Sequence, residues 1–172
     1  MNHFFNPREE KKLVSLKKII EEAKDNFSDN ISQKNAMITI GNMPELWVYP
    51  SQVRSMFRAL IDNALKYSKA GQSPSITIYS EQIEGRRLGT AVPHLDKTYN
   101  AITIQDNGIG FDIEFRDKIF QIFRRLHTQE NFSGKGIGLA ICQRVMANHN
   151  GVIIADAKPG EGASFTLLFP RD

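Results

Sequence analysis

The sequence predicts a two-layer α/β sandwich, in which helices cover one face of a mixed, mostly antiparallel sheet. Three observations support this prediction: amphipathic helical patterns at residues 8–34, 50–68 and 134–148, short strand-like segments between and after them, and a tight turn that joins the last two strands. The 172 residues suffice for one compact domain, since a chain of this length buries roughly 70% of its unfolded surface.

The composition is that of an ordinary globular protein, with 41% hydrophobic and 24% charged residues. A net charge of +3 is too small to argue for a nucleic-acid partner. The single cysteine, Cys142, excludes an internal disulfide and a four-cysteine zinc site, and it favours a reducing compartment. No apolar run approaches the ~18 residues that span a bilayer. We therefore expect a cytoplasmic chain that makes no contact with a membrane.

Residues 8–34 are expected to form one amphipathic helix, because apolar residues recur at spacings of three and four. These residues are Leu13, Leu16, Ile20, Ala23 and Phe27. The same spacing resembles a short coiled-coil seam, but two heptads favour a helix that covers the sheet of its own domain. Brief strands at 37–40 and 46–49 follow, and Pro50 then opens a helix that stops near Gly71.

Two alternating segments, 75–82 and 99–105, predict a strand pair. The stretch between them, 84–98, holds two glycines, a proline and the pair Arg86-Arg87, and is interpreted as a long hairpin excursion with a solvated tip.

A third helix begins in the glycine-rich segment at 134 and ends near Asn150-Gly151. The last two strands are expected at 152–157 and 163–169, joined by the turn at 158–162.

The first segment with a chemical signature lies in the second helix. Asn63, Lys66 and Tyr67 share one helix face, because they are three and four residues apart. An amide oxygen beside a lysine suits a magnesium-phosphate group, since Mg²⁺ accepts hard oxygen ligands and an ammonium balances phosphate charge. From this segment alone, exposure of both side chains to solvent is an equally good interpretation.

The second segment is Asp106-Asn-Gly-Ile-Gly110 at a strand end. Such a sequence often forms only an Asx-type turn. Alternatively, the Asp106 carboxylate accepts a hydrogen bond from the amino group of adenine, and Gly108 and Gly110 let backbone approach the base.

The third segment is Gly134-Lys-Gly-Ile-Gly138, directly before a helix. Free N–H groups and the helix dipole attract phosphate at such a position. The spacing excludes a P-loop and a dinucleotide fingerprint.

In order and spacing, these segments resemble the catalytic, ATP-binding domain of two-component sensor histidine kinases, within the GHKL superfamily shared with gyrase, Hsp90 and MutL. The resemblance covers roughly residues 35–170, and the tetrad at 124–127 is most similar to phytochrome-like and PAS-linked kinases. Residues 60–68 match the N box, 106–110 the first glycine box and 119–125 the F box. Residues 134–139 match the second glycine box, and 160–165 match the closing strand signature.

The resemblance implies a Bergerat-like fold at 35–172, preceded by an N-terminal helix at 1–34 that connects to a dimerisation hairpin. It implies ATP and Mg²⁺ as ligands, with Lys66 and Arg125 as catalytic residues. It further implies that Asn63 binds Mg²⁺, that Lys66 and Tyr67 contact the phosphates or the ribose, and that Arg125 contacts a phosphate. Asp106 would bind adenine, with Gly108 and Gly110 flanking the base. Gly134, Gly136 and Gly138 would be hinges of the lid, Leu139 would start the following helix, and Phe120 and Phe123 would anchor the lid to the core.

The chain departs from the family pattern at Ala59, where a second asparagine is usual, and this predicts weaker binding of Mg²⁺-ATP. Alanine also disfavours a hydrolytic ATPase, whose water-activating glutamate occupies this position. No histidine is followed by an acidic residue, as a phosphoacceptor histidine is. His127 and His149 are interpreted as surface residues of the lid and of a helix end.

The leading hypothesis is therefore a domain that transfers the γ-phosphoryl group of ATP to a histidine on a separate dimerisation segment, in signalling to a response regulator receiver domain. Two alternatives remain: a nucleotide-binding pseudokinase or regulatory module, and an anti-sigma-type serine kinase.

Overall fold

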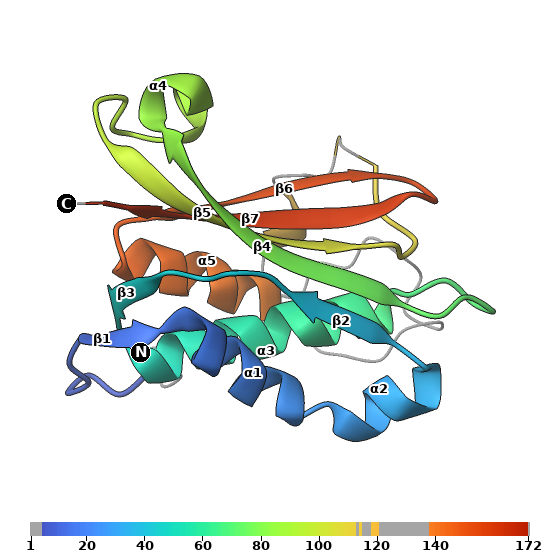
Figure 1. Cartoon of the computed structure of the whole chain (residues 1–172). Coiled ribbons are helices and arrows are strands. Elements are labelled where there is room, and N and C mark those ends of the chain that lie inside the picture. The colour runs from blue at the N-terminus through green and yellow to red at the C-terminus, as the bar shows by residue number, and fades with distance from the viewer. Residues whose placement is uncertain (1–4, 113, 115–117, 121–137, 172) are drawn as a thin grey trace.

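The computed structural model of the chain describes residues 5–112, 114, 118–120 and 138–171. Its main sheet has five strands in the order β2-β4-β5-β7-β6, with β2 parallel to β4 and every other pair antiparallel. The helices α1 (Leu16–Asp25), α2 (Ser28–Lys34), α3 (Pro50–Lys66) and α5 (Gly138–Asn148) lie together on one face of this sheet (Figure 1). The strands are β2 (Met37–Ile40), β4 (Ser75–Glu84), β5 (Thr98–Asp106), β6 (Val152–Lys158) and β7 (Gly162–Pro170). The predicted sandwich is confirmed.

The prediction of one helix over residues 8–34 is wrong. This segment forms a strand and two helices: β1 (Lys12–Ser15), α1 (Leu16–Asp25) and α2 (Ser28–Lys34). β1 pairs antiparallel with β3 (Glu45–Val48) in a separate two-stranded sheet. The Ser15 hydroxyl accepts a hydrogen bond from the Lys18 N–H and so starts α1 at a capped position. The spacing of apolar residues within one segment carries no information about a strand partner thirty residues away. The boundaries between β1, α1 and α2 could therefore not be predicted from it.

The core lies between the sheet and three helices. α1 buries Leu16, Ile20 and Ala23 against α3 (Pro50–Lys66), and α3 packs in turn against α5 (Gly138–Asn148). The described part of the third helix thus begins at Gly138. The expectation that the N-terminal helix covers its own domain is confirmed for α1, whose buried residues belong to the main core.

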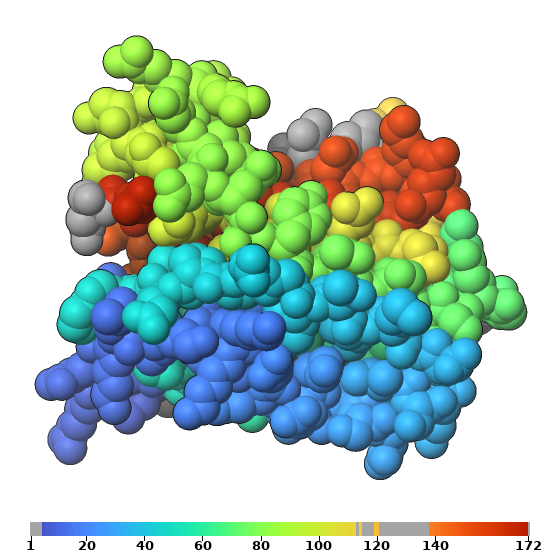
Figure 2. All heavy atoms as spheres, viewed as in Figure 1, coloured from blue at the N-terminus to red at the C-terminus, as the bar shows by residue number. Residues whose placement is uncertain are grey.

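The excursion between β4 and β5 is confirmed. It carries α4 (Gly85–Leu88) and the short 3₁₀ helix η1 (Gly89–Ala91), and it projects from the body as a separate lobe (Figure 2). Val92 of this lobe packs with Tyr99, Ala101 and Leu168 in a second, smaller cluster. The face of the sheet opposite the main helices is therefore covered in part.

Two other predictions concern buried side chains. Phe120, in the short helix η3 (Lys118–Phe120), is buried and contacts Phe165 edge-on, so its expected anchoring role agrees with its place in the core. His149 is not a surface residue, because only 5% of it is exposed. Within the described part of the chain, none of the helices is both long and apolar enough to span a bilayer.

Candidate functional site

The last two turns of α3 present three of the predicted site residues. Seven apolar residues of this helix face the core, so its amphipathic pattern leaves Asn63, Lys66 and Tyr67 half-buried at the edge. The Lys66 ammonium lies 2.9 Å from the Asp62 carboxylate in an exposed ion pair one turn away. Such pairs contribute little to stability, so a phosphate can replace the carboxylate at low cost.

Asn63 has the chemistry of a magnesium ligand. Asn63 is half-buried, and among the described residues its side-chain amide makes no hydrogen bond. No cluster of three or more His, Cys, Asp or Glu side chains among those residues forms a metal cage. A single protein oxygen therefore fits Mg²⁺ that takes its other ligands from phosphates and water.

The turn after β5 places the second half of the site. Asp106 ends the strand, and its Oδ1 atom accepts hydrogen bonds from the N–H groups of Gly108, at 2.9 Å, and Ala163, at 3.2 Å. Burial raises the pKa of the Asp106 carboxyl above its usual value, although both backbone hydrogen bonds oppose this shift. One oxygen is thus engaged in holding the turn, and the carboxyl has a fixed orientation.

The two glycines of this turn are required by close contact with backbone. A Cβ at Gly108 would lie 2.4 Å from the Tyr67 carbonyl oxygen, and one at Gly110 would lie 2.1 Å from that of Lys158. Gly110 also has a φ of +65°, which side chains disfavour. The Ile109 N–H donates to the Tyr67 carbonyl at 2.9 Å, which joins the turn to the end of α3. The structure therefore brings the first two predicted segments together.

Sequence reasoning missed two residues that shape the same turn. Asn107 accepts a hydrogen bond from the Ser75 N–H at 2.8 Å and donates to the Ser73 carbonyl at 3.3 Å. Gly162 has a φ of +96°, and a Cβ there would lie 2.1 Å from the Asp106 carbonyl oxygen. The glycine in the β6–β7 turn was a usable signal, but its partner 56 residues away was not visible in the sequence.

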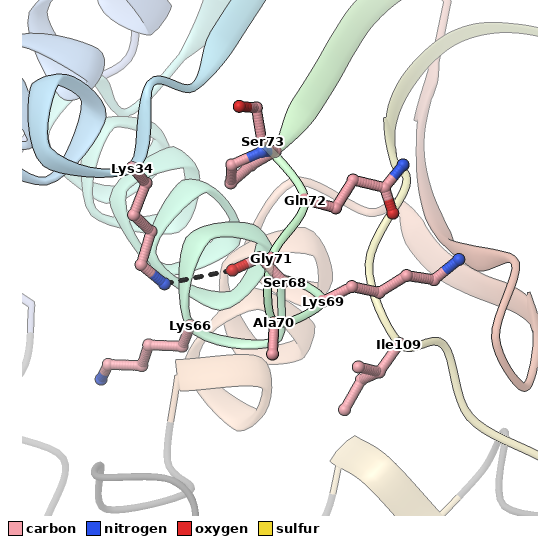
Figure 3. Close-up of a pocket in the computed structure, with 10 residues that line it drawn as sticks. Lys34, Lys66, Ser68, Lys69, Ala70, Gly71, Gln72, Ser73 and Ile109 are labelled. Carbon is pink, nitrogen blue, oxygen red and sulfur yellow. Dashed lines mark hydrogen bonds between the residues drawn. The ribbon is translucent and has the colours of Figure 1, made fainter.

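A hollow of about 670 Å³ opens beside the end of α3, lined by the loop that follows the helix and by Ile109. Three lysines also line it: Lys34, Lys66 and Lys69. Their side chains do not converge, because Lys66 and Lys69 extend in opposite directions while Lys34 points at the helix end (Figure 3). The hollow is therefore not a ready-made pocket for an anion.

The second glycine segment is described only from Gly138 onward. A Cβ at Gly138 would lie 3.4 Å from the Cβ of Ala59, so α5 begins directly against the position where the family usually has its second asparagine. Leu139 packs against the core, as expected for the first turn of α5. Arg125, Gly134, Gly136 and Phe123 lie outside the described residues, and their predicted roles remain predictions.

Residues 49–172 match the family described as histidine kinase-, DNA gyrase B-, and HSP90-like ATPase. The chain belongs to this family. The matched residues include α3, the Asp106 turn and α5, which are the elements that build the site.

Two curated relatives extend the comparison. The phytochrome-like protein Cph1 of Synechocystis sp. is 33% identical over 91% of this chain, and the match covers 19% of Cph1. The adaptive-response sensory kinase SasA of Thermosynechococcus vestitus is 27% identical over 91% of this chain and 38% of its own length. The chain thus spans about a fifth to two fifths of these relatives.

Among solved structures, the nucleotide-free catalytic domain of the histidine kinase ThkA superposes with a TM-score of 0.72. The identity is 21%, over 94% of this chain and 95% of that one. At this identity the likeness concerns the fold, and it confirms the helix-covered mixed sheet.

Proposed function

We propose that this chain binds Mg²⁺-ATP and transfers the γ-phosphoryl group to a histidine on a separate dimerisation segment, in signalling to a response regulator receiver domain. The observation that carries the proposal is the hydrogen bond of 2.9 Å from the Ile109 N–H to the Tyr67 carbonyl. It holds the purine-accepting turn against the helix end that bears Asn63 and Lys66. Membership of the ATPase family and the likeness to SasA and ThkA support the same function.

The base is expected to bind at the Asp106 turn. Its carboxylate only accepts hydrogen bonds, so it favours the amino group of adenine and repels the carbonyl oxygen that guanine has at that position. The Oδ1 atom already holds two backbone N–H groups, so the Asp106 carboxyl is oriented before any ligand arrives. Preorganisation of this kind lowers the ordering cost of binding.

The phosphates are expected to lie along the last turn of α3. Asn63 would hold the magnesium ion, which offsets phosphate charge when bound, and Lys66 would exchange its pairing with Asp62 for a phosphate oxygen. In the transfer step, a histidine ring nitrogen forms a bond to the γ-phosphorus. The bond from that phosphorus to the bridging oxygen breaks, and ADP leaves. The role of this chain is positioning and charge compensation.

Phosphoryl transfer from γ-labelled ATP to the kinase's own histidine hairpin, supplied as a separate fragment, tests the proposal. We expect labelled hairpin with the wild-type chain and a loss of label with Asn63→Ala. Asn30→Ala, on the exposed surface of α2, is the matched control and should leave transfer unchanged. Normal transfer by Asn63→Ala would exclude the proposed metal ligand.

A nucleotide-binding regulatory module that does not transfer phosphate is the second candidate. The presence of Ala59, packed against the start of α5, favours it because one polar group near the metal is missing. Calorimetry with ATP separates the two functions. Affinity that Mg²⁺ increases supports the kinase, whereas metal-independent affinity without transfer supports the regulatory module.

A further inference from the structure

We propose that Lys34, the last residue of α2, is a positioning residue for the nucleotide site. It acts by holding the end of α3 on which Lys66 and Tyr67 sit. The inference rests on the proposed function, because it assigns a support to that same site. Lys34 lies 29 residues before Asn63 in the sequence, outside every segment that resembles the family's boxes.

The Lys34 side chain crosses from α2 to the C-terminal end of α3. Its ammonium donates to the Leu65 carbonyl and, at 3.1 Å, to the Ser68 hydroxyl (Figure 3). The Ser68 hydroxyl in turn donates to the Leu65 carbonyl at 2.9 Å. The last carbonyls of a helix have no partner within it and carry the negative end of the helix dipole. Lys34 supplies both a donor and a positive charge there.

The two residues that Lys34 contacts flank two of the proposed ligand-binding residues. Leu65 and Ser68 lie directly on either side of Lys66 and Tyr67. The Tyr67 carbonyl receives the Ile109 N–H, so any shift of this short segment also moves the Asp106 turn. Lys34 therefore stabilises the one stretch of backbone that both halves of the site share.

The base of the Lys34 side chain is itself fixed. Asn35 follows in the left-handed conformation with a φ of 51°, and the Ala36 N–H closes the end of α2 on the Ile31 carbonyl at 2.9 Å. The next strand, β2, begins at Met37 and pairs with β4. The lysine is thus attached to the sheet at one end and to α3 at the other.

The test uses Lys34→Met, which keeps the length of the side chain and removes its donor. Lys17→Met, at an exposed position of α1, is the matched control. Two readouts are measured: the Kd for ATP with Mg²⁺, and the exchange rate of the Ile109 amide in the nucleotide-free protein. The Gly85 amide, bonded to the Lys97 carbonyl at 2.7 Å in the distant lobe, is the internal reference.

We expect Lys34→Met to raise the Kd by about tenfold, as the loss of one charge-assisted hydrogen bond predicts. Exchange of the Ile109 amide should accelerate by a similar factor, while the Gly85 amide stays unchanged. Lys34→Arg, which retains the charge and the donors, should keep both the Kd and the Ile109 exchange rate close to their wild-type values. Lys17→Met should change neither readout.

Ser68→Ala provides an independent variant, because it removes the second contact and leaves the lysine in place. In a double-mutant cycle the effects of Lys34→Met and Ser68→Ala on the Ile109 amide should be less than additive. Additive effects, or a lower Tm with the Ile109 exchange rate unchanged, would overturn the inference. If the wild-type chain does not bind ATP, the proposed function fails, whereas the exchange of Ile109 still decides whether Lys34 positions the turn.

Discussion

The two ends of α3 are held by different partners. At the N-terminal end, the side chains of Glu9 and His149 accept backbone N–H groups, whereas at the C-terminal end the backbone carbonyls accept from the Ile109 N–H and the Lys34 ammonium. Both carboxylate oxygens of Glu9 bind Ser51, one taking the N–H at 2.9 Å and the other the hydroxyl at 2.7 Å. His149 accepts the Tyr49 N–H at 3.0 Å, so its other ring nitrogen carries the proton that it donates to the Val145 carbonyl at 2.7 Å. Both ring nitrogens of His149 and both oxygens of Glu9 are thus engaged in hydrogen bonds at this end.

At the C-terminal end, the backbone is bonded to the Ile109 N–H and the Lys34 ammonium, while the side chains of Asn63 and Lys66 are half-buried. We call the N-terminal end of α3, where Glu9 and His149 bind, the closed end, and the C-terminal end, which bears the proposed ligand residues Asn63 and Lys66, the open end. The comparison shows that neighbouring elements satisfy free backbone groups at both ends of α3, donors at the first end and acceptors at the second.

Gly110→Ala should have the largest effect, because it separates the turn from the β6–β7 hairpin. The methyl group meets the Lys158 carbonyl and must also adopt a positive φ. We expect a loss of about 3–5 kcal/mol in the free energy of unfolding, measured by urea denaturation. Gly160→Ala is the control: its φ is +78° but no atom lies within 4 Å, so it should cost only about 1–2 kcal/mol. Equal losses would show that the contact is unimportant.

Asp106→Asn should weaken nucleotide binding at the open end of α3 without lowering the stability of the fold. The amide keeps an acceptor for Gly108 and Ala163 but presents donors toward the adenine amino group. We expect the Kd for ATP to rise by about 10- to 100-fold, the range for a hydrogen bond to a charged group.

The same variant should be at least as stable as the wild-type chain at pH 7. Burial raises the pKa of Asp106, so the ionised form is less favourable in the folded state than in the unfolded state. That contribution to stability is present below the ordinary pKa and is lost as the pH rises through the raised value. A clear drop in Tm for Asp106→Asn at pH 7 would contradict this account.

His149→Phe tests the closed end. Loss of the acceptor leaves the Tyr49 N–H unpaired, and we expect a cost of about 1–2 kcal/mol with an unchanged Kd for ATP. Burial lowers the pKa of His149 below 6.5, so the wild-type chain should lose stability as the pH falls from 6.5 toward the lower value. The variant should lack this slope, whereas His94→Gln in the exposed lobe should retain it.

Glu9→Gln should have the smallest effect. Its amide oxygen can still accept the Ser51 N–H and its amide nitrogen can donate to the Ser51 hydroxyl, so the main loss is the negative charge at the start of α3. We expect a loss of about 0.5–1 kcal/mol in the free energy of unfolding, with no change in nucleotide affinity. Glu10→Gln, one residue away and exposed, is the control for the change in net charge. A change in nucleotide affinity would indicate that the two ends of the helix are coupled.

The elements that local pattern defines were predicted closely. Pro50 marks the first residue of α3, the alternating segment at 75–82 forms most of β4, and the turn at 158–162 joins β6 to β7. Each of these signals operates within a few residues, through fixed φ, side-chain alternation or glycine conformation. The order and spacing of the boxes likewise predicted the family.

The remaining features depend on partners that are distant along the chain. β1 separated from the predicted N-terminal helix because it pairs with β3, and His149 became buried because Tyr49 and Phe169 pack on its ring. Lys34 reached the site through a contact across 31 residues.

By itself, the sequence predicted which residues are candidates for nucleotide binding and where most helices and strands lie, because both predictions follow from residue type and short spacing. Only the tertiary structure decided that the turn after Asp106 lies against the end of α3, since the Ile109–Tyr67 hydrogen bond joins segments that are 42 residues apart. It also decided which end of α3 is closed and which is open, because burial and hydrogen-bond pairing are properties of the packed chain.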